Sequence, residues 1–249
     1  MAGHSKWANI KHRKGRQDAL RGKIFTRLGK EITIAARDGG GDPDMNPRLR
    51  LAVKMAKSSS MPNDNIKRAI QKGTGEGGGA AVEEITFEGY APGGIAIVVE
   101  TMTDNRNRTV SEVRSTFTKA NGNLGENGAV MWTFERKGTI SVKNEGKSED
   151  ELMEAVLESG AEDLEFGEES SRIICAMSDY GIVTSWFDEN GFEMEESQLE
   201  YIPKEKQIIE DVSTAKKVLK FIDKMEDLDD VQNVFSNFEI DDSIADELE

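Results

Sequence analysis

The sequence predicts an α+β protein of three domains: an N-terminal three-helix bundle with a basic arm, followed by two ferredoxin-like α/β domains, the middle one discontinuous. Helical periodicity ends near residue 73, a glycine-rich segment follows, and strands then alternate with helices towards the C-terminus. The 249 residues, 37% of them hydrophobic, are enough for several small cores.

The basic arm is residues 1–16, which show no helical period. Nine of the first thirty residues are Lys or Arg and only Asp18 is acidic, whereas the whole chain has a net charge of −15. Residues 1–80 hold seventeen Lys or Arg against seven Asp or Glu. Because a basic module attracts polyanions and an acidic one repels them, we expect only the first domain to lie against nucleic acid.

Three helices are expected between residues 17 and 73. In the first, over 17–38, apolar residues recur every four positions: Leu20, Ile24, Leu28 and Ile32. The second begins at Pro47 behind an Asn46 cap, and the third covers 62–73. The short connections between them favour a small bundle.

Beyond the glycine-rich segment at 73–81, strands are expected in EEITFEGY, GGIAIVVETM and GAVMWTFER, with the turn APGG between the first two. A helix is expected over 110–120, behind a capping box formed by Thr109 and Glu112. This ββαβ order is one helix and one strand short of a ferredoxin-like domain.

Residues 137–205 supply a complete βαββαβ order, and a last helix and strand follow in STAKKVLKFIDKMED and VQNVFSNFEI. The simplest topology lets that last pair complete the middle domain around the inserted one. The expected domains are therefore residues 1–78, residues 82–136 with 206–240, and residues 137–205.

Long, non-repetitive motifs carry a resemblance to a known family. They are MAGHSKWANIKHRKGRQDA, GGGDPDMNPRLRLAV, MPNDNIKRAI, EGYAPGG, TDNRNRT and the segment from GNLG to FERKG. On these motifs the chain closely resembles the YebC family, densely to about Gly138 and more loosely beyond it. One departure is Leu20, where relatives often carry Lys.

The resemblance implies one helical and two α/β domains, and a non-enzymatic role in gene expression without a cofactor. Bacterial members are called probable transcriptional regulators, and a mitochondrial relative is a translational activator of a cytochrome oxidase subunit. Some members are described as binding DNA near promoters. Others are described as binding the ribosome and easing elongation through proline-rich stretches, so both functions stay open here.

The candidate nucleic-acid-binding residues belong to the arm and the first helix. Cations neutralise phosphates and Trp7 can stack on an unpaired base, which suits single-stranded or structured RNA better than B-DNA. The alternatives are a solvated basic tail and an ordinary exposed helix face. The candidates are His4, Lys6, Trp7, Lys11, His12, Arg13, Lys14, Arg16, Arg21, Lys23, Arg27 and Lys30.

The motif TDNRNRT, residues 103–109, precedes a helix and is a candidate anion or partner site through Asn105, Arg106, Asn107 and Arg108. Arginine pairs well with phosphate, and a helix N-terminus exposes N–H groups. An equally favoured alternative is a capped loop whose arginines bind nearby carboxylates.

Other motifs favour structure over chemistry. EGYAPGG joins two strands and lacks both phosphate-loop patterns, so a tight turn is expected. His4 and His12 have no Cys or His partners for a metal, and Cys175 lies in an apolar strand as inert core. We therefore expect no enzyme activity, no metal and no cofactor.

The lone cysteine predicts a reducing cytoplasm, and the chain lacks a run of about 18 apolar residues that would predict a membrane span. The expected protein is a monomeric regulator that binds DNA or rRNA through its arm and first helix, with the ribosome as the alternative partner. A DNA regulator would discriminate between duplex sequences, whereas a ribosome factor would prefer folded RNA.

Overall fold

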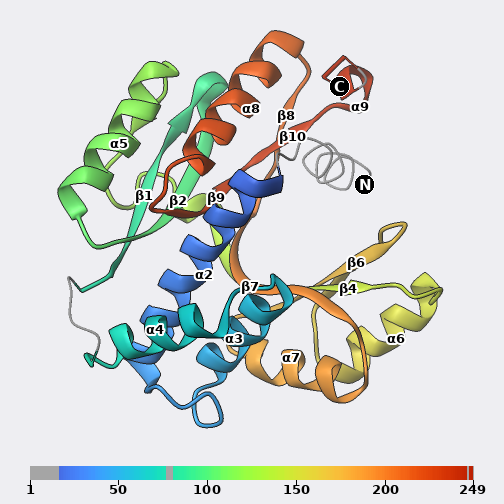
Figure 1. The fold of residues 1–249 in the computed structure, drawn as a ribbon. Coiled ribbons are helices and arrows are strands. Elements are labelled where there is room, and N and C mark those ends of the chain that lie inside the picture. The colour runs from blue at the N-terminus through green and yellow to red at the C-terminus, as the bar shows by residue number, and fades with distance from the viewer. Residues whose placement is uncertain (1–16, 77–80, 246, 249) are drawn as a thin grey trace. The chain divides into compact units, whose positions relative to one another are not determined.

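The computed structural model describes residues 17–76, 81–245 and 247–248, with side chains from Gly22 onward. Helices are combined with two four-stranded antiparallel sheets and one two-stranded parallel sheet among the described residues, in the α+β class that the sequence predicts (Figure 1). The chain divides into two compact units: a host unit of Met1–Thr133 with Glu205–Glu249, and an inserted unit of Phe134–Lys204. No helix of the described part combines the length and apolar composition needed to cross a membrane.

The host unit contains a helical bundle and a four-stranded sheet. Its described helices are α2 (Gln17–Gly39), α3 (Pro47–Ser58), α4 (Asn63–Gly73), α5 (Arg106–Lys119), α8 (Val212–Glu226) and α9 (Asp242–Ala245). Its described strands are β1 (Glu83–Ala91), β2 (Ile95–Thr103), β3 (Asn123–Leu124), β8 (Gln207–Ile209), β9 (Val231–Ser236) and β10 (Phe238–Ile240).

The bundle of α2, α3 and α4 has the helix boundaries that periodicity and capping predict. The Asn46 side chain accepts a hydrogen bond from the backbone N–H of Leu49 at 3.1 Å and so caps α3, as expected. Its amide group also donates to the carbonyl of Ala35 in α2 at 2.7 Å. One residue therefore starts α3 and fixes it to α2, beside a core that includes Ile32, Leu49 and Ile66.

The host sheet has the strand order β3-β1-β2-β9, so it joins strands from before and after the inserted unit. Helices α5 and α8 pack in one core against it, where the rings of Phe117 and Phe221 lie 4.9 Å apart (Figure 1). The order differs from a ferredoxin-like sheet because the β1–β2 hairpin is central. Nearly every residue of β2 is buried, so it needs a neighbour on each side.

The segment GAVMWTFER is not a third strand of this sheet, contrary to the sequence prediction. The third strand is the two-residue β3, and residues 131–133 form a 3-10 turn. The reason is Glu88 of β1, whose buried carboxylate accepts backbone N–H groups of Gly128, Val130 and Met131 at 2.7–2.9 Å. These N–H groups are thus satisfied by a side chain and unavailable to a strand ladder.

The helix after β2 also begins earlier than predicted. It starts at Arg106 behind the N-cap Asn105, whose side chain accepts from the N–H of Arg108 at 3.2 Å. The predicted cap, Thr109, is buried inside the first turn and its hydroxyl contacts Asp230. The Thr109 hydroxyl therefore binds Asp230, which is 121 residues away in sequence, and does not cap the helix.

The inserted unit contains β4 (Phe134–Lys143), α6 (Glu149–Ser159), β5 (Asp163–Glu165), β6 (Ser170–Ala176), α7 (Tyr180–Glu189) and β7 (Met194–Pro203). Its antiparallel sheet has the order β5-β6-β4-β7, which is the ferredoxin-like arrangement. In this sheet Phe134 pairs with Pro203, so the chain enters and leaves the unit at neighbouring points.

Candidate nucleic-acid interface

Most of the predicted arm residues lie outside the described part of the chain. They are His4, Lys6, Trp7, Lys11, His12, Arg13, Lys14 and Arg16. Arg21 belongs to α2, where its backbone is described. The structure therefore locates the side chains of three candidates, Lys23, Arg27 and Lys30.

These three α2 cations all contact the C-terminal end of α8 and the residues that follow it. A helix C-terminus attracts cations because its last carbonyl groups lack helical N–H partners. The contacts are an ion pair of Lys23 with Asp227, a 2.8 Å hydrogen bond from Arg27 Nη2 to the Glu226 carbonyl, and a 2.7 Å bond from Lys30 Nζ to the Asp229 carbonyl.

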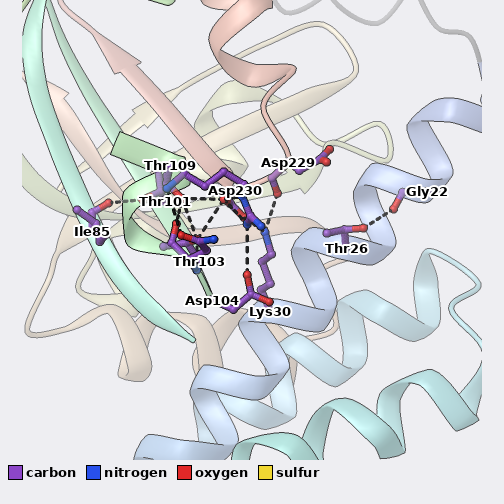
Figure 2. A network of polar contacts seen from close by, with 12 residues as sticks. Gly22, Thr26, Lys30, Ile85, Thr101, Thr103, Asp104, Thr109, Asp229 and Asp230 are labelled. Carbon is purple, nitrogen blue, oxygen red and sulfur yellow. Dashed lines mark hydrogen bonds and ion pairs between the residues drawn. The ribbon is translucent and has the colours of Figure 1, made fainter. Parts of the chain in front are cut away.

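Asp230 is the centre of a buried polar network beside this contact (Figure 2). Its carboxylate accepts from Lys30 Nζ at 2.7 Å and from Arg108 Nη2 at 2.7 Å. The hydroxyl groups of Thr109 and Thr103 lie 2.7 and 3.1 Å from its Oδ2 atom. Burial alone would raise the pKa of Asp230, but the hydrogen bonds from Lys30, Arg108 and Thr109 lower it to about 2.

The Asp230 network ties four elements of the host unit together. Lys30 comes from α2, Thr103 from the end of β2, Arg108 and Thr109 from the first turn of α5, and Asp230 from the connection between α8 and β9. The Asp230 side chain is 2% exposed, so its charge is balanced by Lys30 and Arg108 and not by water. Lys30 is therefore held in place by the fold.

The TDNRNRT residues have partners within the host unit. Asn105 caps α5, Arg106 binds Glu83 at 3.2 Å, and Arg108 binds Asp104 at 3.2 Å as well as Asp230. Asn107 is exposed on the first turn. In this arrangement both arginines bind carboxylates, as the capped-loop interpretation describes.

Two further motifs serve the fold. The APGG segment is the expected tight turn between β1 and β2, with Gly93 and Gly94 at φ values of 80° and 75° that favour glycine. Cys175 is buried in β6, and burial together with the charges of Glu162 and Asp179 raises its pKa to about 11. Its thiol is thus protonated at neutral pH, unlike a nucleophilic cysteine.

Sequence reasoning missed a second group of exposed cations, on α8 and α5. They are Lys216, Lys217, Lys220, Lys224, Arg114 and Lys119. The signal is present in the segment STAKKVLKFIDK, where the lysines recur at helical spacing. The abundance of Asp and Glu beyond residue 80 hides this stripe when charge is summed over the whole segment.

The geometry defines a multidomain α+β protein in which a helical bundle is joined to a discontinuous sheet through the buried carboxylate of Asp230. Residues 5–76 match the family model described as the TACO1/YebC protein N-terminal domain, and residues 82–238 match that of the TACO1/YebC second and third domain. The chain belongs to the TACO1/YebC family, as the sequence motifs indicate.

Relatives match over essentially the full length. A probable transcriptional regulatory protein of Fusobacterium nucleatum is 50% identical over 249 residues, covering 100% of both chains. One of Halothermothrix orenii with the same description is 51% identical, covering 100% of this chain and 99% of that one. The crystal structure of a conserved hypothetical protein from Aquifex aeolicus is 48% identical, with a TM-score of 0.85 over 90% of this chain and 93% of that one.

Proposed function

We propose that this protein is a non-enzymatic, nucleic-acid-binding regulator of gene expression that acts in the cytoplasm as a monomer. The supporting observation is the separation of charge along the chain. Residues 1–80 hold seventeen Lys or Arg against seven Asp or Glu, whereas the inserted unit holds six against nineteen. A polyanion is attracted to the first segment and repelled by the second, so its binding is directional.

Within the basic segment, phosphate binding is assigned to the arm and the start of α2. Arg27 and Lys30 already bind the end of α8, and Lys30 also belongs to the buried Asp230 network. Lys23 differs because its partner Asp227 has a 71% exposed side chain. A surface ion pair contributes about 0–1 kcal/mol, so a phosphate can replace Asp227 at little cost.

The non-enzymatic part of the proposal is supported by how the buried ionisable groups are used. The carboxylates of Asp230 and Glu88 accept internal hydrogen bonds, and each has a lowered pKa despite its burial. The Cys175 thiol has a raised pKa. These are the opposite shifts from those of a general acid or base poised near neutral pH or of an activated thiolate.

A ribosome or rRNA target is the alternative, and the acidity of the inserted unit favours it. A DNA duplex offers only phosphate charge, which repels that unit. A ribonucleoprotein offers phosphate to the arm and basic protein surfaces to the inserted unit. In this version the protein eases elongation at proline-rich stretches, as some YebC family members are described to do, whereas the names of the bacterial relatives favour transcription.

Sedimentation of the tagged protein through sucrose gradients tests the proposal and separates the two targets. Lysate is run at low and moderate salt, with and without mild RNase, for the wild type and the arm variant Lys11→Gln/Arg13→Gln/Lys14→Gln. A control with the same change in net charge is Lys137→Gln/Lys143→Gln/Lys147→Gln in the inserted unit.

Co-sedimentation with ribosomes that the arm variant alone loses supports the ribosome target. A protein that stays at the top of the gradient while binding a defined DNA duplex through its arm supports the transcriptional target. If the arm variant and the control behave like the wild type in both assays, the arm has no role in nucleic-acid binding and the proposal is wrong.

A further inference from the structure

Helix α8 carries a stripe of four lysines on its solvent face. Lys216, Lys217, Lys220 and Lys224 are all exposed. At about 100° per residue they fall within an arc of about 100°. The opposite face, which includes Val218, Phe221 and Met225, is buried in the core of the host unit. The stripe is therefore fixed in orientation by packing.

The lysine stripe borders the seam between α8 and α5. Phe221 of α8 and Phe117 of α5 mark that seam, because their ring centroids are 4.9 Å apart. Residues three or four positions apart share one side of a helix, so Lys217 and Lys224 flank Phe221. By the same spacing Arg114 flanks Phe117. Helices α5 and α8 pack in one core against the same sheet (Figure 1), and the helical spacing places these cations beside the two rings at the seam.

These cations differ in their partners from Lys23, Arg27 and Lys30 of α2. The four lysines of α8 and Arg114 have no side-chain hydrogen bond or ion pair to any residue that the structure describes. Two acidic residues lie near the stripe: Asp211 at the N-cap of α8, whose charge acts on Lys217, and Asp223, three positions after Lys220. Four lysines against these two carboxylates leave a net positive charge on this face of α8.

We propose that the seam between α5 and α8 is a second binding surface for the phosphate backbone of nucleic acid. The inference rests on the proposed function and adds a surface to it. Lys216 to Lys224 spans about 12 Å at 1.5 Å per residue. One strand of a duplex presents a phosphate about every 3.4 Å, so four lysines face about three to four phosphates.

A lipid headgroup offers the same phosphate chemistry, but the surface does not suit a membrane. A helix that binds a bilayer inserts its apolar face among the acyl chains, whereas the apolar face of α8 is occupied by the protein core. Among the described residues, no large hydrophobic side chain that is exposed lies on α5 or α8. The surface offers charge without an apolar anchor, which matches a nucleic-acid backbone.

The test measures fluorescence anisotropy with two labelled probes, a 20-base-pair DNA duplex and a folded RNA hairpin, across a salt series. The seam variant is Lys217→Gln/Lys220→Gln/Lys224→Gln in the full chain. The control is again Lys137→Gln/Lys143→Gln/Lys147→Gln, which removes the same charge from the inserted unit, and circular dichroism checks that both fold. Flotation with phosphatidylserine vesicles tests whether the same proteins bind lipid.

The seam variant is expected to bind at least one probe on the order of tenfold more weakly. For the duplex, the slope of log K against log salt should fall by about 2.7, or 0.9 for each lost phosphate contact. Equal binding by the seam variant and the control overturns the proposal for the seam and leaves the role proposed for the arm unaffected. Loss of vesicle flotation with unchanged probe binding assigns the seam to lipid and also overturns it. A wild type that binds neither probe refutes the proposed function and the seam together.

Discussion

The lysines of α2 and those of α8 are the same residue type on two amphipathic helices of one unit, yet they have opposite environments. Lys30 of α2 binds Asp230, whose side chain is 2% exposed, and its own side chain is 17% exposed. Lys220 of α8 is exposed and has no such partner among the described residues. The two helices could not be distinguished by counting charges.

What separates them is the position of the countercharge. The segment Glu226–Asp230, at the end of α8, supplies carboxylates and free carbonyl groups to α2 but not to the lysines of its own helix. A basic stripe can therefore hold a fold together or remain available to a polyanion. Sequence periodicity identifies the stripe, and only the tertiary contacts decide between these roles.

The largest expected effect comes from removing the countercharge of α2. Asp230→Asn leaves Lys30 and Arg108 without their buried carboxylate, so the free energy of unfolding should fall by about 3–5 kcal/mol. Urea denaturation followed by circular dichroism measures it. The matched control is Asp229→Asn, because Asp229 is exposed and binds Lys30 through its backbone carbonyl. Equal stability of the two variants would contradict a buried network.

Acid should act on the same carboxylate. The pKa of Asp230 is lowered to about 2, whereas an unfolded Asp titrates near 3.9. A carboxylate with a lowered pKa stabilises the fold above its unfolded pKa and loses that contribution as the pH falls through the folded pKa. The difference in unfolding free energy between wild type and Asp230→Asn should shrink by about 2.6 kcal/mol between pH 6 and pH 1. If the difference in unfolding free energy stays constant over this pH range, the pKa of Asp230 is not lowered in the folded protein.

The smallest effect compares the two helices directly. Lys30→Gln removes a charged hydrogen bond to a buried group and should cost about 1.5–3 kcal/mol. Lys220→Gln is a surface change and should alter stability by less than about 0.5 kcal/mol. Thermal and urea unfolding of the two variants provide the measurement. Similar losses in both would mean that α8 lysines are also structural.

Local signals in the sequence predicted much of the fold correctly. Asn46 with Pro47 marks the start of α3 as predicted, and the structure adds a signal of the same local kind, the capping box of Ser148 and Glu151 at the start of α6. In each case the residues that cap the helix are close in sequence to the groups they bind. Such signals are readable because the interaction is complete within one turn.

Predictions failed where a residue distant in sequence bound the backbone or side-chain group on which the local pattern depends. Glu88 binds the N–H groups of a segment 40 residues away, which converts an alternating, strand-like pattern into a loop. Asp230 binds the hydroxyl of Thr109, so that residue is not a cap. For the candidate site, the sequence identified the α2 cations but could not show that Asp230 would lie beside Lys30, since the two are 200 residues apart.

The pairing of Phe134 with Pro203 bears on how the gene for this protein can be rearranged. The two ends of the inserted unit are adjacent, so the unit replaces a short turn in the host chain. The entropy cost of closing the host chain around it is therefore about that of a loop of a few residues. Insertions are tolerated best where they leave the backbone hydrogen bonds of the host undisturbed. The net charge of −13 on the inserted unit is thus carried by a segment that recombination could exchange as a single module.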